Sequence, residues 1–383
     1  MTSRPNNELV PVWIREIDAY KPGRPIEEVE RELGIHATKL ASNENPLGPS
    51  PMAVEAARRA MASSNWYPDG AGFYLRKKLS GQLGVEMERL ILGAGSCELI
   101  DLVARTLLTP GDNAVSSEGS FPLYYTAVRA TGEKLTLVPL RDFALDLDGI
   151  ARATDSRTRV IYAANPNNPT GTIFTADEFE AFLARIPESA LVVLDEAYFE
   201  YADRPGYSRS LDLVRAGRNL MVLRTFSKVY GLAGMRVGYA AGPADLIAQM
   251  NKVRQPFNVS CASLAAAEAA LDDLEHVSRS VENNRRGLAQ LEAGLRAQGI
   301  SYVPSAANFM LVHLGPEANR IADALLHLGV IVRPMAWMGF PEAIRVSVGT
   351  ASENDKFLVA LSEARASHSA SRPQAVGPAR PSA

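Results

Sequence analysis

The sequence predicts an α/β protein with a mostly parallel central sheet, helices on both of its faces, and a smaller α+β domain. From Arg89 onward, short β-rich runs alternate with segments of helical periodicity, which is the pattern of βαβ units. The chain has 383 residues and is 46% hydrophobic, enough to bury a large core and a second, smaller one. Ligands of such sheets bind at the carboxyl ends of the strands, so we expect the functional loops there.

The individual elements follow from local patterns. The segment before residue 52 is rich in proline, and we expect an extended arm because each proline removes a backbone donor and restricts the preceding residue. Helices are expected at 53–62 and 74–83. The strands of the large sheet are expected at 90–92, 113–117, 134–140, 160–165, 191–194, 219–223 and 237–241. Two Ala-rich helices, at 263–273 and 276–298, lead to strands near Tyr302 and at 309–313, 330–333 and 344–348.

These elements divide the chain into four parts. Residues 1–52 are expected to form an N-terminal arm that belongs in part to the small domain. Residues 53–275 would form the large domain and residues 276–366 the small C-terminal domain. Ser, Pro, Gly and Ala dominate residues 367–383, so we expect a disordered tail there.

Composition narrows the class of partner. The formal net charge is -3 and the basic residues are scattered, which disfavours binding to nucleic acid or to a membrane surface. Cys97 and Cys261 are far apart, which argues against a disulfide framework and a zinc site and fits a reducing compartment. No apolar run approaches the ~20 residues of a membrane span, and the N-terminus lacks the apolar core of a signal peptide. We therefore expect a cytoplasmic protein without a metal, whose partners are small molecules and copies of itself.

Lys228 is the candidate nucleophile. It lies among hydroxyls, glycines and an arginine, directly after an apolar run. In a partly desolvated pocket the neutral amine of a lysine adds to carbonyls as a Schiff base. Thr225, Ser227 and Arg236 are groups that bind phosphate, because hydroxyls donate singly and a guanidinium donates two parallel bonds. A ring that carries an aldehyde and a phosphate describes pyridoxal phosphate. An isolated lysine is more often a solvated surface side chain. The assignment of Lys228 as a nucleophile therefore depends on the neighbouring motifs.

A second motif runs from Gly93 to Glu98, where a strand gives way to a glycine turn and the start of a helix. Free amides at a helix N-terminus suit an anionic phosphate. Glu98 stands where the dinucleotide fingerprint requires a small residue, so a nicotinamide cofactor is disfavoured. A purely structural βα turn remains the alternative.

Two further motifs supply polar groups for the ring. Asp195 follows a buried strand, and a carboxylate opposite the pyridine nitrogen keeps it protonated and makes the ring an electron sink. A magnesium-binding role for Asp195 would need a phosphate-binding loop that the sequence lacks. The structural alternatives for Asp195 are an N-cap and a buried ion pair. Asn168, in the loop 165–171, and Tyr198 are placed to donate hydrogen bonds to the phenolate oxygen of the ring.

Together these motifs resemble the fold-type-I pyridoxal-phosphate aminotransferases, and among them the histidinol-phosphate aminotransferase family. The resemblance extends from Tyr20 to Leu361. Its finer signals are residues 43–50 (NENPLGPS), 67–70 (YPDG), 224–228 (RTFSK), 329–334 (GVIVRP) and 344–350 (IRVSVGT). Two positions depart from the usual pattern: Cys97 stands in place of an acidic residue, and Phe121 in place of a tyrosine.

The resemblance implies a role for each matching position. Lys228, Asp195 and Tyr198 would be the catalytic residues, with Lys228 carrying the cofactor and shuttling the proton. The cofactor-binding residues would be Lys228, Asp195, Tyr198, Asn168, Thr225, Ser227, Arg236, Gly95, Ser96, Cys97, Phe121 and Tyr67. The residues that bind the anionic substrate would be Arg345, Arg333, Tyr20, Asn43 and Tyr67. Tyr67 would reach the phosphate of the neighbouring subunit, which implies a homodimer with composite active sites.

The resemblance further implies the reaction, in which L-histidinol phosphate and 2-oxoglutarate give imidazole-acetol phosphate and L-glutamate in histidine biosynthesis. An aromatic amino-acid aminotransferase is the first alternative, since Trp337, Met338 and Phe340 lie between Arg333 and Arg345. A decarboxylase of phosphorylated amino acids would instead release CO₂ without an oxo acid. A pyridoxal-sensing regulator would need an attached DNA-binding domain.

Overall fold

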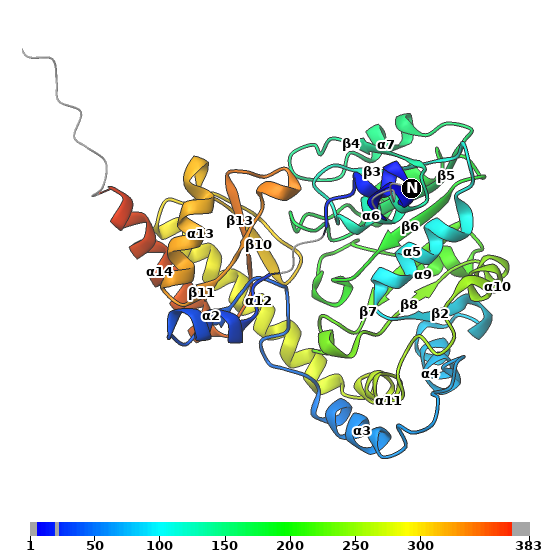
Figure 1. The fold of residues 1–383 in the computed structure, drawn as a ribbon, viewed down its shortest axis with the longest axis horizontal. Helices are drawn as coiled ribbons and strands as arrows, with labels where there is room; N and C mark the ends of the chain where they lie inside the picture. Colours follow the sequence, from blue (N-terminus) through cyan, green and yellow to red (C-terminus); the bar gives the residue numbers. More distant parts are fainter. Residues whose placement is uncertain (1–5, 20–22, 370–383) are drawn as a thin grey trace, which may run out of the picture.

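The computed structural model describes residues 6–19 and 23–369, and a seven-stranded sheet forms the centre of its larger part (Figure 1). The strand order is β2-β8-β7-β6-β5-β3-β4. β8 runs antiparallel to both neighbours and the other pairs are parallel. The strands are β2 (Leu90–Gly93), β3 (Asn113–Ser117), β4 (Lys134–Val138), β5 (Thr158–Ala164), β6 (Leu191–Asp195), β7 (Leu220–Thr225) and β8 (Gly238–Ala241). The expectation of a mostly parallel sheet is therefore confirmed.

Helices cover both faces of this sheet. Successive residues of a strand point to opposite faces, and in β5 Tyr162 joins one buried core whereas Ile161 joins the other. On the first side lie apolar residues of α5, α6 and α10, and on the second those of α4, α7, α8 and α11. The helices of this part are α3 (Pro51–Met61), α4 (Phe73–Leu83), α5 (Ser96–Leu107), α6 (Leu123–Ala130), α7 (Leu147–Ala153), α8 (Ala176–Leu183), α9 (Ser210–Arg215), α10 (Ala244–Val253) and α11 (Cys261–Ala270).

The smaller part contains an antiparallel sheet of order β12-β13-β10-β9 and the parallel pair β1·β11. In Figure 1 the long helix α12 runs from this part towards α11 of the larger one. The strands are β1 (Thr38–Lys39), β9 (Tyr302–Val303), β10 (Phe309–His313), β11 (Val330–Ile331), β12 (Arg333–Pro334) and β13 (Ala343–Ser347). The helices are α12 (Leu274–Ala297), α13 (Ala318–His327) and α14 (Ala351–Ser369). Short 3-10 turns occur at Asn6–Leu9, Met87–Arg89, Phe199–Tyr201, Ala233–Met235, Gly315–Glu317 and Ala336–Met338.

The N-terminal segment is not the extended arm that its prolines predict. It contains α1 (Val12–Arg15) and the two-turn helix α2 (Ile26–Leu33). Pro25 lies immediately before α2, where proline costs no helical hydrogen bond, and Gly34 ends the helix at φ 67°. α1 packs on α6 through the ion pair Glu16–Arg129, whereas β1 joins the small part by pairing with β11.

The C-terminal helix is longer than expected. α14 ends at Ser369, so residues 367–369 are helical, and the rest of the expected tail lies outside the described residues. The domain limits 53–275 and 276–366 remain a proposal, with α12 beginning at Leu274. Among residues 6–19 and 23–369, none of the helices combines the length and the apolar character needed to cross a membrane.

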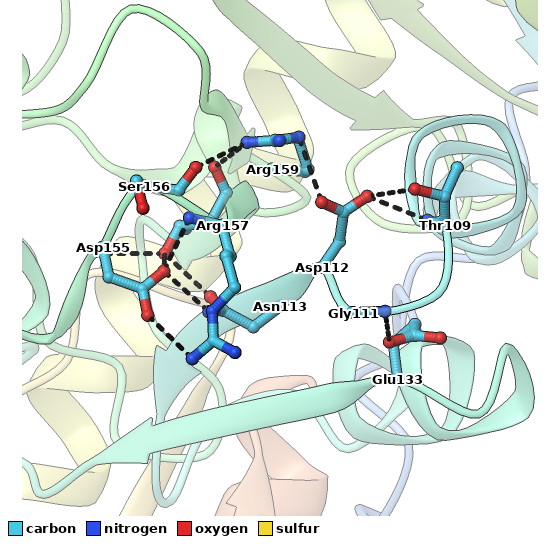
Figure 2. A network of polar contacts seen from close by, with 10 residues as sticks. Thr109, Gly111, Asp112, Asn113, Glu133, Asp155, Ser156, Arg157 and Arg159 are labelled. Carbon is cyan, nitrogen blue, oxygen red and sulfur yellow. Dashed lines mark hydrogen bonds and ion pairs between the residues drawn. The ribbon is translucent and has the colours of Figure 1, made fainter.

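A polar network fixes the amino ends of β3 and β5 (Figure 2). Asn113 Nδ2 donates to Asp155 Oδ1 at 2.8 Å, and Thr158 Oγ1 donates to Asn113 Oδ1 at 2.7 Å. The ion pair between Asp112 and Arg159, at 3.2 Å, closes the other side of the network. These bonds lie where the register between β3 and β5 shifts, so they compensate for the interrupted ladder. They occupy the opposite edge of the sheet from the carboxyl strand ends.

Candidate active site

A cavity of about 270 Å³ lies at the carboxyl ends of the large sheet, between the two parts of the chain. β6 ends there at Asp195 and β7 at Thr225, while β12 and β13 supply residues from the small part. The predicted site residues that line this cavity are Asn43, Ser96, Cys97, Phe121, Asn168, Asp195, Tyr198, Thr225, Ser227, Lys228, Arg236, Arg333 and Arg345. Most residues singled out from the sequence therefore converge on one place.

Lys228 is half-buried at the centre of this group. Its Nζ lies 3.3 Å from the carbonyl oxygen of Asn43 and 3.4 Å from that of Ser42. Burial, followed by the charge of Arg345, lowers the pKa of the Lys228 amine from 10.5 to about 8. A larger fraction of the amine is thus neutral near pH 7 than in a solvated lysine, which is the state that adds to an aldehyde.

Asp195 is buried and held from two sides. Its Oδ2 accepts a hydrogen bond from Tyr124 Oη at 2.9 Å, and its Oδ1 accepts one from the Ala197 amide at 3.1 Å. Burial raises the pKa of Asp195 to about 6, although both hydrogen bonds lower it. A carboxylate buried to this degree is stabilised by a cation within contact distance, and a protonated pyridine nitrogen is such a cation.

Residues suited to a phosphate gather at the start of α5. Gly95 precedes the helix at φ 79°, and a Cβ built there would lie 2.5 Å from Arg236 Nη2. Arg236 Nη1 donates to Ser227 Oγ at 3.3 Å, and Thr225 Oγ1 donates to the same oxygen at 3.0 Å. The start of α5, two hydroxyls and one guanidinium therefore line the same cavity, and this donor set fits a phosphate dianion.

Tyr198 and Asn43 form a buried pair. Asn43 Nδ2 donates to Tyr198 Oη at 2.9 Å, and Ser347 Oγ donates to Asn43 Oδ1 at 3.1 Å. The side-chain amide of Asn43, predicted to bind substrate, is thus bonded to Tyr198 and Ser347. Since the Tyr198 oxygen already accepts a hydrogen bond from Asn43, its own proton is left to donate elsewhere. Burial raises the pKa of Tyr198 to about 12, so the hydroxyl keeps that proton.

Arg333 and Arg345 stand opposite each other on the antiparallel strands β12 and β13. Directly opposed residues of paired strands project to the same face of a sheet, so both guanidinium groups face one region. Arg345 Nη1 donates to Asn168 Oδ1 at 2.5 Å and Nη2 donates to the Ala41 carbonyl at 2.9 Å. Because Oδ1 of Asn168 is engaged in this way, its Nδ2 is the atom that remains to donate to a ring oxygen.

A second cavity, of about 880 Å³, adjoins the first and shares Phe121, Tyr124 and Arg333 with it. Trp337 and Met338 line it, as the aromatic alternative expects, whereas Phe340 lies against Gly119. This space has room for the side chain of a substrate whose anionic end lies at the arginines.

One predicted residue, Tyr67, does not reach the site of its own chain. Tyr67 lies between α3 and α4, is 82% exposed, and stacks on Phe257 with the ring centroids 4.6 Å apart. Tyr20 lies outside the described residues. Gly95 lies directly before α5, with Arg236 packed against it.

Three contacts escape sequence reasoning. They are the bond from Tyr124 to Asp195, the bond from Ser347 to Asn43, and the buried ion pair of Glu196 with Arg224 at 2.8 Å. For Tyr124 a signal exists, because a residue three positions after Phe121 at the start of a helix faces the same way. The other two join residues 304 and 28 positions apart and have no local signature.

The comparison with known sequences defines the class. The chain belongs to the aminotransferase class I and II family, whose sequence profile matches residues 35–361. The chain is similar to histidinol-phosphate aminotransferase 1 of Nitrosococcus oceani, with 47% identity over 355 residues that cover 92% of this chain and 96% of the relative. It is also similar to histidinol-phosphate aminotransferase 2 of Pseudomonas aeruginosa, with 49% identity over 351 residues, 91% of this chain and 95% of the relative.

Solved structures agree on the fold. The structure of histidinol-phosphate aminotransferase from Sinorhizobium meliloti in complex with pyridoxal-5'-phosphate matches with a TM-score of 0.85 and 30% identity, over 93% of this chain and 97% of that one. A mutant aspartate aminotransferase of Thermus thermophilus matches with a TM-score of 0.80 and 27% identity, over 93% and 99% of the two chains. The expected fold, fold type I of the pyridoxal-phosphate enzymes, is confirmed.

Proposed function

We propose that this protein uses pyridoxal phosphate to convert L-histidinol phosphate and 2-oxoglutarate into imidazole-acetol phosphate and L-glutamate. The observation that carries the proposal is the cavity in which Lys228, Asp195 and the paired Arg333 and Arg345 converge. The similarity to two histidinol-phosphate aminotransferases at 47% and 49% identity supports the choice of substrate. When bound, the cofactor supplies an aldehyde for the amino group and a ring that accepts the electrons left when the α-proton departs.

Residues of the large part would hold the cofactor. Lys228 would take the aldehyde, Asp195 the protonated ring nitrogen, and Phe121 would stack on the ring. The phosphate would lie against Thr225, Ser227, Arg236 and the turn at Gly95, Ser96 and Cys97. Burial raises the pKa of the Cys97 thiol, so this residue adds no negative charge beside the phosphate.

The proton transfer falls to Lys228. Its free Nζ would lie within the same cavity, and a pKa of about 8 would allow it both to accept the α-proton of the donor and to return it. Tyr198 and Asn168 Nδ2 would donate to the phenolate oxygen of the cofactor. The hydroxyl of Tyr198 is oriented for this by the hydrogen bond that its oxygen accepts from Asn43.

Both substrates would present an anion to the same pair of arginines. Arg345 is 7% exposed and Arg333 is 9% exposed, so a charge-assisted bond to either is shielded from water. The phosphate of histidinol phosphate or the carboxylate of glutamate would bind Arg345, helped by Arg333. The rest of histidinol phosphate, with its imidazole ring, would extend towards the second cavity.

The substrate is tested with a donor panel on the purified protein, with 2-oxoglutarate as the common acceptor. Histidinol phosphate should have a kcat/KM about 10- to 150-fold above that of phenylalanine, because its phosphate dianion offers the arginines one more charge-assisted contact than a carboxylate does, and such a contact contributes roughly 1.5–3 kcal/mol. A higher kcat/KM for phenylalanine would favour the aromatic alternative, which Trp337 and Met338 in the second cavity support. Release of CO₂ without an oxo acid would identify a decarboxylase.

The composite homodimer is part of the proposal, as is a cytoplasmic location. Three aromatic side chains line one hollow of the surface, where Trp66 is 73%, Tyr67 82% and Phe257 44% exposed. An exposed apolar surface of this kind marks an interface between proteins. Since Tyr67 lies on it, the partner's copy of this residue would complete the phosphate site.

Mixed dimers test this arrangement. Lys228→Ala and Tyr67→Ala proteins should each be weak, and refolding them together in equal amounts should restore about one quarter of the wild-type sites, because half of the dimers are mixed and each carries one intact site. If Tyr67 served its own chain, mixing would restore nothing. Full activity of Tyr67→Ala alone would remove the residue from the site.

A further inference from the structure

We propose that Tyr124 is a positioning residue that acts through Asp195, fixing the carboxylate against the ring nitrogen of the cofactor so that the nitrogen stays protonated. The inference rests on the proposed use of pyridoxal phosphate but not on the identity of the amino donor. It starts from the hydrogen bond of 2.9 Å between Tyr124 Oη and Asp195 Oδ2.

The carboxylate of Asp195 is held at both oxygens. The Ala197 amide donates to Oδ1 at 3.1 Å, and Tyr124 donates to Oδ2. With one protein donor on each oxygen, the carboxylate plane cannot rotate freely, and lone pairs remain for a ring N–H. The backbone amide is present whatever the side chains are, so Tyr124 is the part of this arrangement that a substitution can remove.

The ring of Tyr124 is itself fixed. It is 1% exposed and stacks on Tyr162, with the centroids 4.9 Å apart and the planes 5° from parallel. Phe121, the aromatic residue expected to stack on the cofactor, meets Tyr124 edge-on at 5.7 Å. Tyr124 therefore contacts both Asp195 and Phe121, the two residues expected to contact the ring of the cofactor.

The protonation state of Tyr124 suits a permanent donor. Burial, together with the neighbouring charge of Asp195, raises the pKa of its hydroxyl well above the ordinary value of 10. The hydroxyl stays neutral over the whole range in which Asp195 titrates. Without it, Asp195 would be the stronger base, because the hydrogen bond from Tyr124 lowers the pKa of the acid. The proton shared with the ring would then lie nearer to Asp195, and the ring would attract electrons less strongly.

Tyr124→Phe removes only the hydroxyl and keeps the stacked ring. Tyr162→Phe is the matched control: Tyr162 is equally buried and belongs to the same stack, but its hydroxyl donates to the Ile100 carbonyl at 3.0 Å rather than to Asp195. The apoproteins are titrated with pyridoxal phosphate and with an analogue in which C–H replaces the ring nitrogen. Thermal melts of both apoproteins report whether the stack is intact.

Tyr124→Phe should bind pyridoxal phosphate about tenfold more weakly than wild type, the size of one hydrogen bond to a charged group. The affinities of wild type and Tyr124→Phe for the carbon analogue should agree within about twofold, because the analogue has no ring nitrogen that could bond to Asp195. Tyr162→Phe should match wild type with either ligand. In turnover, Tyr124→Phe should lower kcat with little change in KM for the amino donor.

Equal weakening of both ligands by Tyr124→Phe, or the same loss in Tyr162→Phe, would show that Tyr124 acts only through packing and would overturn the proposal. An unchanged affinity of Tyr124→Phe for pyridoxal phosphate would also overturn it. If Tyr124→Phe fails to fold, a ring-fluorinated tyrosine at position 124 donates more strongly with the same shape. It should tighten binding of pyridoxal phosphate relative to the analogue, and an absent change would contradict the inference. Failure of the wild-type protein to bind pyridoxal phosphate would instead overturn the proposed function.

Discussion

Arg224→Met should destabilise the protein markedly, because it breaks a fully buried ion pair behind the site. Arg224 Nε and Nη2 donate to Glu196 Oε2 at 3.0 and 2.8 Å, and Ser208 Oγ donates to Glu196 Oε1 at 2.6 Å. The side chains of Arg224 and Glu196 are 7% and 0% exposed. The guanidinium also covers the ring of Phe199, 3.4 Å from its centroid. Methionine fills similar space but leaves the Glu196 carboxylate buried without its cation.

The magnitude follows from the burial. Removing one partner of a buried pair costs roughly 3–5 kcal/mol, since the remaining charge stays desolvated. An unfolding entropy of about 2.1 cal/mol/K per residue amounts to about 0.8 kcal/mol/K for 383 residues. The Tm of Arg224→Met should therefore fall by about 4 to 6 °C.

Scanning calorimetry of the apoprotein measures this shift without the contribution of cofactor binding. Arg209→Met is the control: Arg209 pairs with Glu180 at 3.0 Å but is 49% exposed, so its loss should move the Tm by less than about 1 °C. The double variant Arg224→Met/Glu196→Leu should recover most of the loss, because no buried charge remains unpaired. A Tm within about 1 °C of wild type for Arg224→Met, or a double variant as unstable as the single one, would refute the reasoning.

Three other predictions concern the site. The rate at which the apoprotein captures pyridoxal phosphate, measured by absorbance, should rise with pH and level off above about pH 8, because Lys228 Nζ is neutral above its lowered pKa. A rate that continues to rise to about pH 10 would contradict the lowered pKa. Arg345→Gln should lower kcat/KM for anionic donors by about 10- to 150-fold and shift the Lys228 profile to higher pH, because the Arg345 charge contributes to the lowered pKa. In equilibrium dialysis, Gly95→Ala should weaken binding of pyridoxal phosphate but not of pyridoxal, because the added Cβ would meet Arg236. The control is Gly217→Ala, which is also at positive φ but has open space around it and should bind both ligands normally.

Local patterns were sufficient to predict most elements and to single out the residues that line the cavity. The apolar run before Asp195 forms β6, and the observed strand ends at the acid itself. The run before Lys228 forms β7, which ends at Thr225. Strand ends of a parallel sheet meet at one edge, so these residues had to converge once the βαβ pattern was recognised.

Local patterns were wrong about the N-terminal segment and did not indicate the partners of the Asn43 amide. The prolines before residue 52 indicated an extended arm, but Pro25 lies directly before α2 and does not prevent the helix. Nothing in the sequence indicates that the Asn43 amide bonds to Tyr198 and Ser347, and its contact with substrate stays a prediction. Both outcomes depend on what packs nearby.

By itself, the sequence determined the α/β class and the order of the elements and singled out the candidate reactive groups, because periodicity, turn residues and side-chain chemistry are properties of short segments. Only the tertiary structure decided that Tyr124 meets Asp195, that Arg333 faces Arg345 across two strands, and that Glu196 is neutralised by Arg224. Such contacts join segments that approach each other only when apolar faces are buried, and the strength of each depends on the water removed around it.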